Sequence, residues 1–182
     1  EPADTDEFLV SDAGVLKRMD YSYIKGGGIT VADQWRLTTS FTGAIDPLAS
    51  NLEQVDGTAQ GTLGSAMSVS SGIWTFPSTG FWWVFAQGRV TRTGEELRYN
   101  HLGIKATTDN STYTAIALGT SGMHSDSASN NTYMATSTLL DVTNTTNVKI
   151  KFYTAVESSS ASWYGSSTEN NTFFTFIRLG DT

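Results

Sequence analysis

Two histidines are the first candidates for chemistry in this sequence, and neither has partners at a useful spacing. His101 lies within the stretch 99–103, and His124 lies within the Ser/Gly/Asn-rich stretch 119–131. A zinc site needs further His, Cys, Asp or Glu ligands at short, regular intervals, and both histidines lack them. The segment 119–122 has the sequence Gly-Thr-Ser-Gly, without the strand-to-helix context of a nucleophile elbow. Both histidines are therefore predicted to be structural or exposed, and no cofactor is expected.

The carboxylates offer a second chemistry, the acid–base pair of a glycoside hydrolase. Glu95 and Glu96 are adjacent, so in a strand they point to opposite faces, and at a hairpin tip they are solvated. Asp109 and Asp126 are expected on different loops. Such a pair must stand about 5 to 10 Å apart, and the sequence does not bring two carboxylates together. The loops also lack the regular acidic spacing of a calcium site. The sequence predicts neither an enzyme nor a metal protein.

The stretch 72–86 is the most informative element for positioning other residues. It predicts two strands, joined by a turn at Pro77 and Gly80. From 81 to 86 every residue is apolar, which indicates dry contacts on both faces of the second strand. Trp82, Val84 and Ala86 would face the core. The other set, Phe81, Trp83 and Phe85, needs a cover from a further layer of the same chain or from another subunit.

Alternating apolar residues and frequent turn residues predict further strands, which favours an all-β sandwich. The expected strands are 34–41, 65–70, 97–107, 112–118, 132–142, 148–156 and 172–179. Two long loops are expected at 119–131 and 158–171. The chain shows no fixed repeat, which disfavours propellers and solenoids.

Composition excludes several classes of protein. The net charge is −7 with only 16% charged residues, and the sequence shows no basic cluster, so nucleic-acid binding is disfavoured. Cysteine is absent, which excludes disulfides and thiol chemistry. No apolar run reaches the roughly 18 residues of a membrane span, so membrane insertion is not expected.

The spacing Trp74-x5-Gly80-x-Trp82-x-Val84-x-Ala86 resembles the signature of the complement globular-head family, whose jelly roll is shared with tumour necrosis factor. The stretches 139–150 and 173–179 resemble that family's strand–turn–strand and closing aromatic strand. Val84 and Ala86 stand where the family has aromatics, and Met67 where it has an upstream aromatic. The resemblance implies a homotrimer packed around a threefold axis. Carried over by position, the residues facing the axis are Phe81, Trp83, Phe85, Phe173, Thr175 and Ile177.

The N-terminal residues 1–28 are predicted to form an arm, and residues 29–182 the jelly-roll head. Two short apolar segments flank the turn 11–14, which indicates a β-hairpin, followed by a Gly26–Gly28 joint. Two strands are too few to stand alone, so the hairpin needs a partner. The segment 8–21 resembles pieces of bacteriophage fibre proteins, which implies attachment to other virion proteins. The alternative is a hairpin that packs on the main domain.

These patterns lead to the hypothesis of a trimeric bacteriophage fibre or spike knob at the virion surface that adheres to a host glycan or protein. The alternatives are a capsid-surface decoration protein and a secreted lectin-like or signalling domain. Recognition is expected on loops. The candidates are Met123 and His124 in 119–131, and Trp163 and Tyr164 in 158–171, where an aromatic pair would stack on sugar unless it packs inside the protein.

Overall fold

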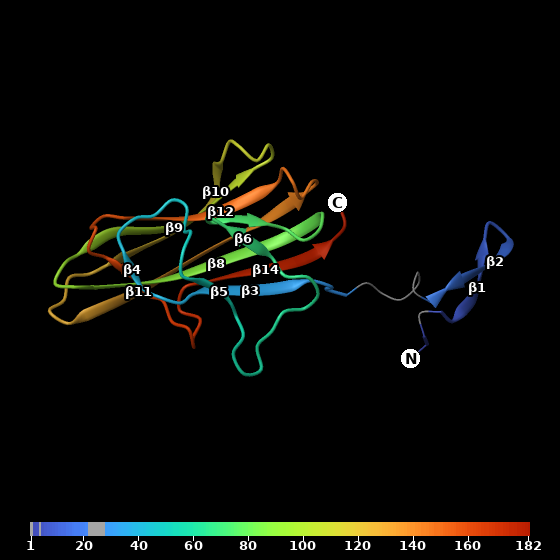
Figure 1. Cartoon of the computed structure of the whole chain (residues 1–182), viewed down its shortest axis with the longest axis horizontal. Coiled ribbons are helices and arrows are strands. Elements are labelled where there is room, and N and C mark those ends of the chain that lie inside the picture. The colour runs from blue at the N-terminus through green and yellow to red at the C-terminus, as the bar shows by residue number, and fades with distance from the viewer. Residues whose placement is uncertain (1, 4, 22–27) are drawn as a thin grey trace.

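A computed structural model of the chain describes residues 2–3, 5–21 and 28–182. The described residues form a small N-terminal hairpin and, apart from it, an elongated β-sandwich (Figure 1). In this part of the chain no helix has the length and apolar character to cross a membrane.

The N-terminal hairpin pairs β1 (Glu7–Asp12) with β2 (Val15–Asp20). Ala13 and Gly14 both have positive φ, as a two-residue hairpin turn of the I′ type requires. Phe8, Leu9 and Leu16 are exposed. The hairpin that the sequence predicted is present, and its apolar side chains are left without cover in the single chain. Residues 26 and 27 of the predicted joint lie outside the described residues.

The first sheet of the sandwich has five strands in the order β10-β9-β12-β7-β6. They are β6 (Ser68–Ser70), β7 (Ile73–Thr75), β9 (Leu97–Thr107), β10 (Thr114–Met123) and β12 (Lys149–Val156). The predicted strand at 97–107 has the observed bounds of β9. Ser71 and Gly72 both have positive φ and form the tight turn between β6 and β7.

The second sheet is built around β8 (Gly80–Thr93), the longer strand of the stretch that the sequence singled out. β11 (Ser129–Val142) pairs with β8 over its whole length, so β14 (Phe173–Gly180) and β13 (Ser162–Trp163) share the other edge. The sheet continues from β14 to β3 (Ala32–Leu37) and β5 (Leu52–Gln54), and from β13 to β4 (Phe41–Thr42).

The core between the sheets is aromatic. Trp82, Val84 and Ala86 of β8 are fully buried, as the alternation predicted, together with Phe174 and Phe176 of β14. The rings of the core contact one another with centroid distances between 4.0 Å, for Phe152 and Phe174, and 6.5 Å, for Phe76 and Phe176. Burial of this size holds the two sheets face to face and fixes which side of β8 faces outward.

The predicted loop at 119–131 is wrong in extent, because β10 continues to Met123 and β11 begins at Ser129. Small residues there serve close packing. A Cβ at Gly119 would lie 2.6 Å from the carbonyl oxygen of Ala135, so glycine lets the edge strand β10 approach β11. The Ser/Gly/Asn-rich composition of 119–131 suggested a loop, but the small residues are there because β10 and β11 pack closely together.

Candidate assembly surface

The outer face of the second sheet carries a cluster of apolar side chains. Strand register places Leu139, Trp83 and Ile177 in one row across β11, β8 and β14. The Trp83 and Phe85 rings are 5.5 Å apart, and the Phe85 and Phe173 rings 5.8 Å apart. We call this surface the apolar face, and it comprises Phe81, Trp83, Phe85, Leu139, Phe173 and Ile177.

All six residues that the family resemblance placed at a threefold axis lie on this side of the sheet. Phe81 is exposed, and Trp83, Phe85, Phe173, Thr175 and Ile177 are half-buried. Sequence reasoning missed Leu139, which is 60% exposed and adds its side chain to the same surface. Its alternation with the inward Leu140 was the available signal. The contact between subunits stays a prediction.

One end of the apolar face passes into a polar cluster centred on Arg89. The Arg89 guanidinium lies 4.3 Å from the Tyr164 ring centroid and 5.9 Å from that of Tyr133. It donates hydrogen bonds to the side-chain oxygens of Asn131 and Asn171. The predicted recognition residue Tyr164 is therefore exposed, and it is held in place by a cation–π contact.

The sequence left two possibilities for Trp163, stacking on a sugar beside Tyr164 or packing inside the protein, and the structure shows the second. Trp163 is fully buried, stacks on Phe41 at 6.2 Å, and donates from Nε1 to the carbonyl oxygen of Gly43 at 3.1 Å. Consecutive side chains of an extended segment point to opposite faces, so Trp163 of β13 enters the core and Tyr164, directly after the strand, faces outward. Gly88 makes room, because a Cβ there would lie 2.5 Å from the indole.

In the other predicted recognition pair, Met123 and His124, one residue is buried and the other is exposed. Met123 ends β10 and is only 7% exposed, so the prediction that it contacts a receptor is wrong. His124 follows in the shortened loop and is exposed, and its carbonyl oxygen accepts a hydrogen bond from Asn130. The earlier start of β11 and the later end of β10 leave residues 124–128 as the connection.

Two of the candidate carboxylates, Glu95 and Asp126, lie on neighbouring segments at one end of the sandwich, and Asp109 lies beyond the other end of β9. The amide of Gly94 donates to the carbonyl oxygen of Asp126 at 2.8 Å, so the tip that carries Glu95 lies beside the 124–128 loop. A hydrogen bond from Arg92 holds the pKa of Glu95 below its ordinary value. A general acid needs a raised pKa, and the pKa of Glu95 is shifted in the opposite direction.

His101 is half-buried on β9, with its ring 4.9 Å from that of Tyr99. Among the described residues no group of three His, Asp or Glu side chains could hold a metal ion.

The outer face of the first sheet has a different character, which the sequence did not reveal. Lys105 and Lys151 both pair with Asp46, and Lys149 donates to the Thr75 hydroxyl at 2.7 Å. These are the only lysines from residue 29 onward. Lys149 and Lys151 share a face because they are two apart in a strand, but Lys105 joins them only through the pairing of β12 with β9.

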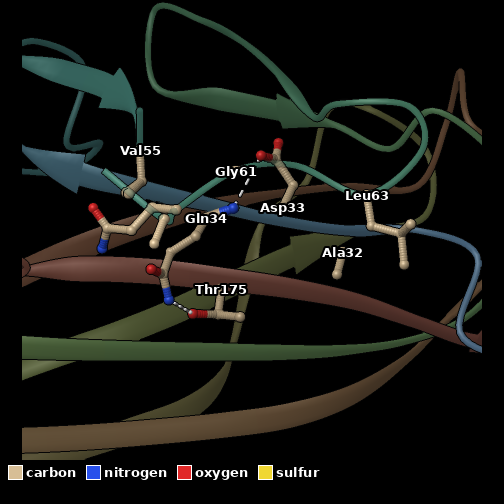
Figure 2. Close-up of a pocket in the computed structure, with 9 residues that line it drawn as sticks. Ala32, Asp33, Gln34, Val55, Gly61, Leu63 and Thr175 are labelled. Atoms are coloured by element: carbon tan, nitrogen blue, oxygen red, sulfur yellow. Dashed lines mark hydrogen bonds between the residues drawn. The ribbon is translucent and has the colours of Figure 1, made fainter. Parts of the chain in front are cut away.

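A buried carboxylate anchors the edge of the second sheet. Asp33 accepts hydrogen bonds from the amide of Met67, the indole of Trp35 and the side chains of Gln54 and Thr62. These donors tie β3 and β5 to the segment 55–67. Beside it lies a hollow of about 320 Å³, into which Gln34 extends to donate to Thr175 at 2.8 Å (Figure 2). The donors to Asp33 give it a structural role.

Comparison with known proteins gives likeness in structure alone. No family model matches the chain, and no curated protein matches it either. Eiger TNF from S. frugiperda superposes with a TM-score of 0.64 at 10% identity, over 85% of this chain and 96% of that one. Murine APRIL at pH 5.0 superposes with a TM-score of 0.57 at 10% identity, over 82% of this chain and 98% of that one. The sandwich is a jelly roll of the tumour necrosis factor type. The predicted all-β fold is confirmed.

Proposed function

We propose that three copies of this chain assemble through the apolar face into the head of a bacteriophage fibre or spike, which adheres to a host surface. The observation that carries the proposal is the run of Phe81, Trp83, Phe85, Leu139 and Ile177 along neighbouring strands, of which Phe81 and Leu139 are exposed in the single chain and the others half-buried. A contiguous apolar surface is a liability for a soluble monomer and marks an interaction site. The family resemblance supports a threefold arrangement.

The N-terminal hairpin supports attachment to a larger particle. Its strands expose Phe8, Leu9, Val15 and Leu16, and an isolated two-stranded ribbon is marginal in water. The resemblance of residues 8–21 to bacteriophage fibre proteins favours other virion proteins as the partner. The head then works by multivalent binding, since three weak contacts on one rigid body act together. No catalytic step is part of this proposal.

Light scattering on the full chain tests assembly, with an expected mass of three times 19.6 kDa. Adhesion is tested by flow cytometry of a panel of bacterial strains mixed with the labelled protein. A stable monomer at micromolar concentration would contradict the trimer. Release of reducing ends from envelope polysaccharide would contradict a purely adhesive role.

A secreted signalling domain is the second candidate, because both reported neighbours superpose over more than four fifths of this chain. Binding to cultured animal cells, with none to bacteria, would favour it. A capsid-surface decoration protein would use the same trimer, and counting copies per particle separates it from a fibre tip.

A further inference from the structure

A polar pocket lies on the outer side of the second sheet, between the loops 56–60 and 167–168. Its volume is about 600 Å³, within the range of small-molecule sites. The lining residues are Arg36, Asp56, Gly57, Thr58, Gln60, Ser167 and Thr168. Arg36 is almost fully buried although its side chain leaves the outer side of β3, because these loops cover it.

The Arg36 guanidinium has one nitrogen without a hydrogen-bond partner in the described chain. Nε donates to Glu53 at 2.7 Å and Nη2 to Asp56 at 3.0 Å, whereas Nη1 is buried and unpaired. A buried N–H without an acceptor costs free energy, which a bound acceptor oxygen would recover. Arg36 lines the pocket, so a ligand oxygen that reached Nη1 would meet a fixed, charge-assisted donor.

The charges around the pocket select the kind of ligand. Two carboxylates, Glu53 and Asp56, face a single guanidinium, so the site has a surplus negative charge that disfavours anions. The Asp56 side chain is 82% exposed, so it can still accept from a ligand. The other side chains at the pocket carry hydroxyl or amide groups, which do not suit an apolar ligand, and the positive charge of Arg36 disfavours a metal cation.

We propose that this pocket binds a neutral saccharide. A sugar hydroxyl both accepts and donates, so one oxygen accepts from Arg36 Nη1 and a neighbouring hydroxyl donates to Asp56. Thr58, Gln60 and Ser167 line the site with the side-chain groups that such a polyol contacts. The inference rests on the adhesive role proposed above and assigns that role to the loops 56–60 and 167–168. Since Arg36 stands opposite Phe173 in the strand register, the pocket borders the apolar face.

The test uses amide and guanidinium NMR spectra of the full chain. The probes are the methyl glycosides of glucose, galactose, mannose and N-acetylglucosamine, with glucuronic acid and N-acetylneuraminic acid as anionic probes. We expect at least one neutral glycoside to shift the signals of Arg36, Thr58 and Ser167. The substitutions Asp56→Asn and Thr58→Val, at exposed positions, should each weaken binding about tenfold, equivalent to about 1.4 kcal/mol. Asp126→Asn, an exposed carboxylate on another loop, is the matched control.

Four outcomes would overturn the proposal: no shift with any neutral glycoside, shifts confined to the Arg89–Tyr164 cluster, a preference for the acidic sugars, or protection of the pocket amides by assembly alone. The last outcome would mean that a second copy of the chain occupies the pocket. If bacterial adhesion survives both substitutions, the pocket is not the adhesion site, but the proposed adhesive function is still supported. A monomeric mass would contradict the proposed trimer without bearing on saccharide binding in the pocket.

Discussion

The two outer faces of the sandwich are built on similar antiparallel strands, yet they present opposite chemistry. The face of β11, β8 and β14 gathers Trp83, Phe85, Leu139 and Ile177. The face of β9 and β12 gathers lysines around Asp46. The side chains that face the core are mostly apolar in both sheets, so packing in the core does not explain why the two outer faces differ. Outward positions of a strand are chemically independent of inward ones, and each face can serve a separate purpose.

Placing charged residues on the apolar face should have the largest effect of the changes considered, because it should dissociate the assembly. In the double variant Trp83→Glu/Leu139→Glu, two carboxylates would have to be desolvated at the contact, so the mass should fall from three times 19.6 kDa to 19.6 kDa. Light scattering measures the change. Leu118→Glu is the matched control, since Leu118 is 50% exposed on β10 in the other sheet. Dissociation by the control, or a trimer that survives the double variant, would show that the two faces have the wrong roles.

The comparison can be sharpened at two neighbouring aromatic residues that face opposite ways, Trp163 at the end of β13 and Tyr164 directly after it. Trp163→Ala should lower the free energy of unfolding by about 3–5 kcal/mol, as expected for a buried aromatic. Tyr164→Ala, on the outer side, should cost less than about 1 kcal/mol. Urea unfolding followed by fluorescence measures both. Equal losses would contradict the inward and outward assignment.

How far the sequence predicted this structure depends on the range of the interactions involved. The alternation in 81–86 identified both faces of β8, because side chains of a strand alternate whatever surrounds them. The turns predicted at 11–14 and at Pro77 and Gly80 are also present, the first narrowed to residues 13–14, because turn residues act locally. Met123 and the lysine group were missed, and Trp163 was left open, because their places depend on which strands pair. The Arg36 pocket also escaped prediction, since its loops are more than 100 residues apart in the chain.

On the lysine-bearing face, Asp46→Asn should have a smaller effect. It weakens the ion pairs with Lys105 and Lys151, which are partly exposed, so we expect a loss of about 1 kcal/mol and no change in mass. Thermal unfolding together with light scattering checks both parts. A change in mass would mean that this face also takes part in assembly.

The smallest effect per residue is expected from acid, through protonation of two carboxylates beside the first sheet, Asp46 and Asp109. Burial raises the pKa of Asp46, but hydrogen bonds from Lys105 and Lys151 outweigh it and hold the pKa below its usual value. The amide of Thr112 and the hydroxyl of Thr107 lower the pKa of Asp109. A pKa that is lower in the folded state gives stability that is present above the unfolded value, near 3.8, and is lost as the pH falls.

The melting temperature should therefore decline as the pH falls below about 4. Asp109→Asn should flatten that decline. An unchanged slope in this variant would exclude Asp109 as a source of the acid sensitivity.

The unbroken register of β8 with β11 has a mechanical consequence. β3 starts opposite the end of β14, so the arm leaves the sandwich at the end where β8 begins, and the tips at 94–96 and 124–128 lie at the far end (Figure 1). A force applied between the arm and those tips runs along the strands. Where the force reaches the tip at 124–128, it loads the hydrogen bonds along the fourteen paired positions of β8 and β11 in shear, together, instead of peeling them one at a time. A head held at one end and pulled at the other would therefore extend only if many hydrogen bonds between β8 and β11 broke at the same time.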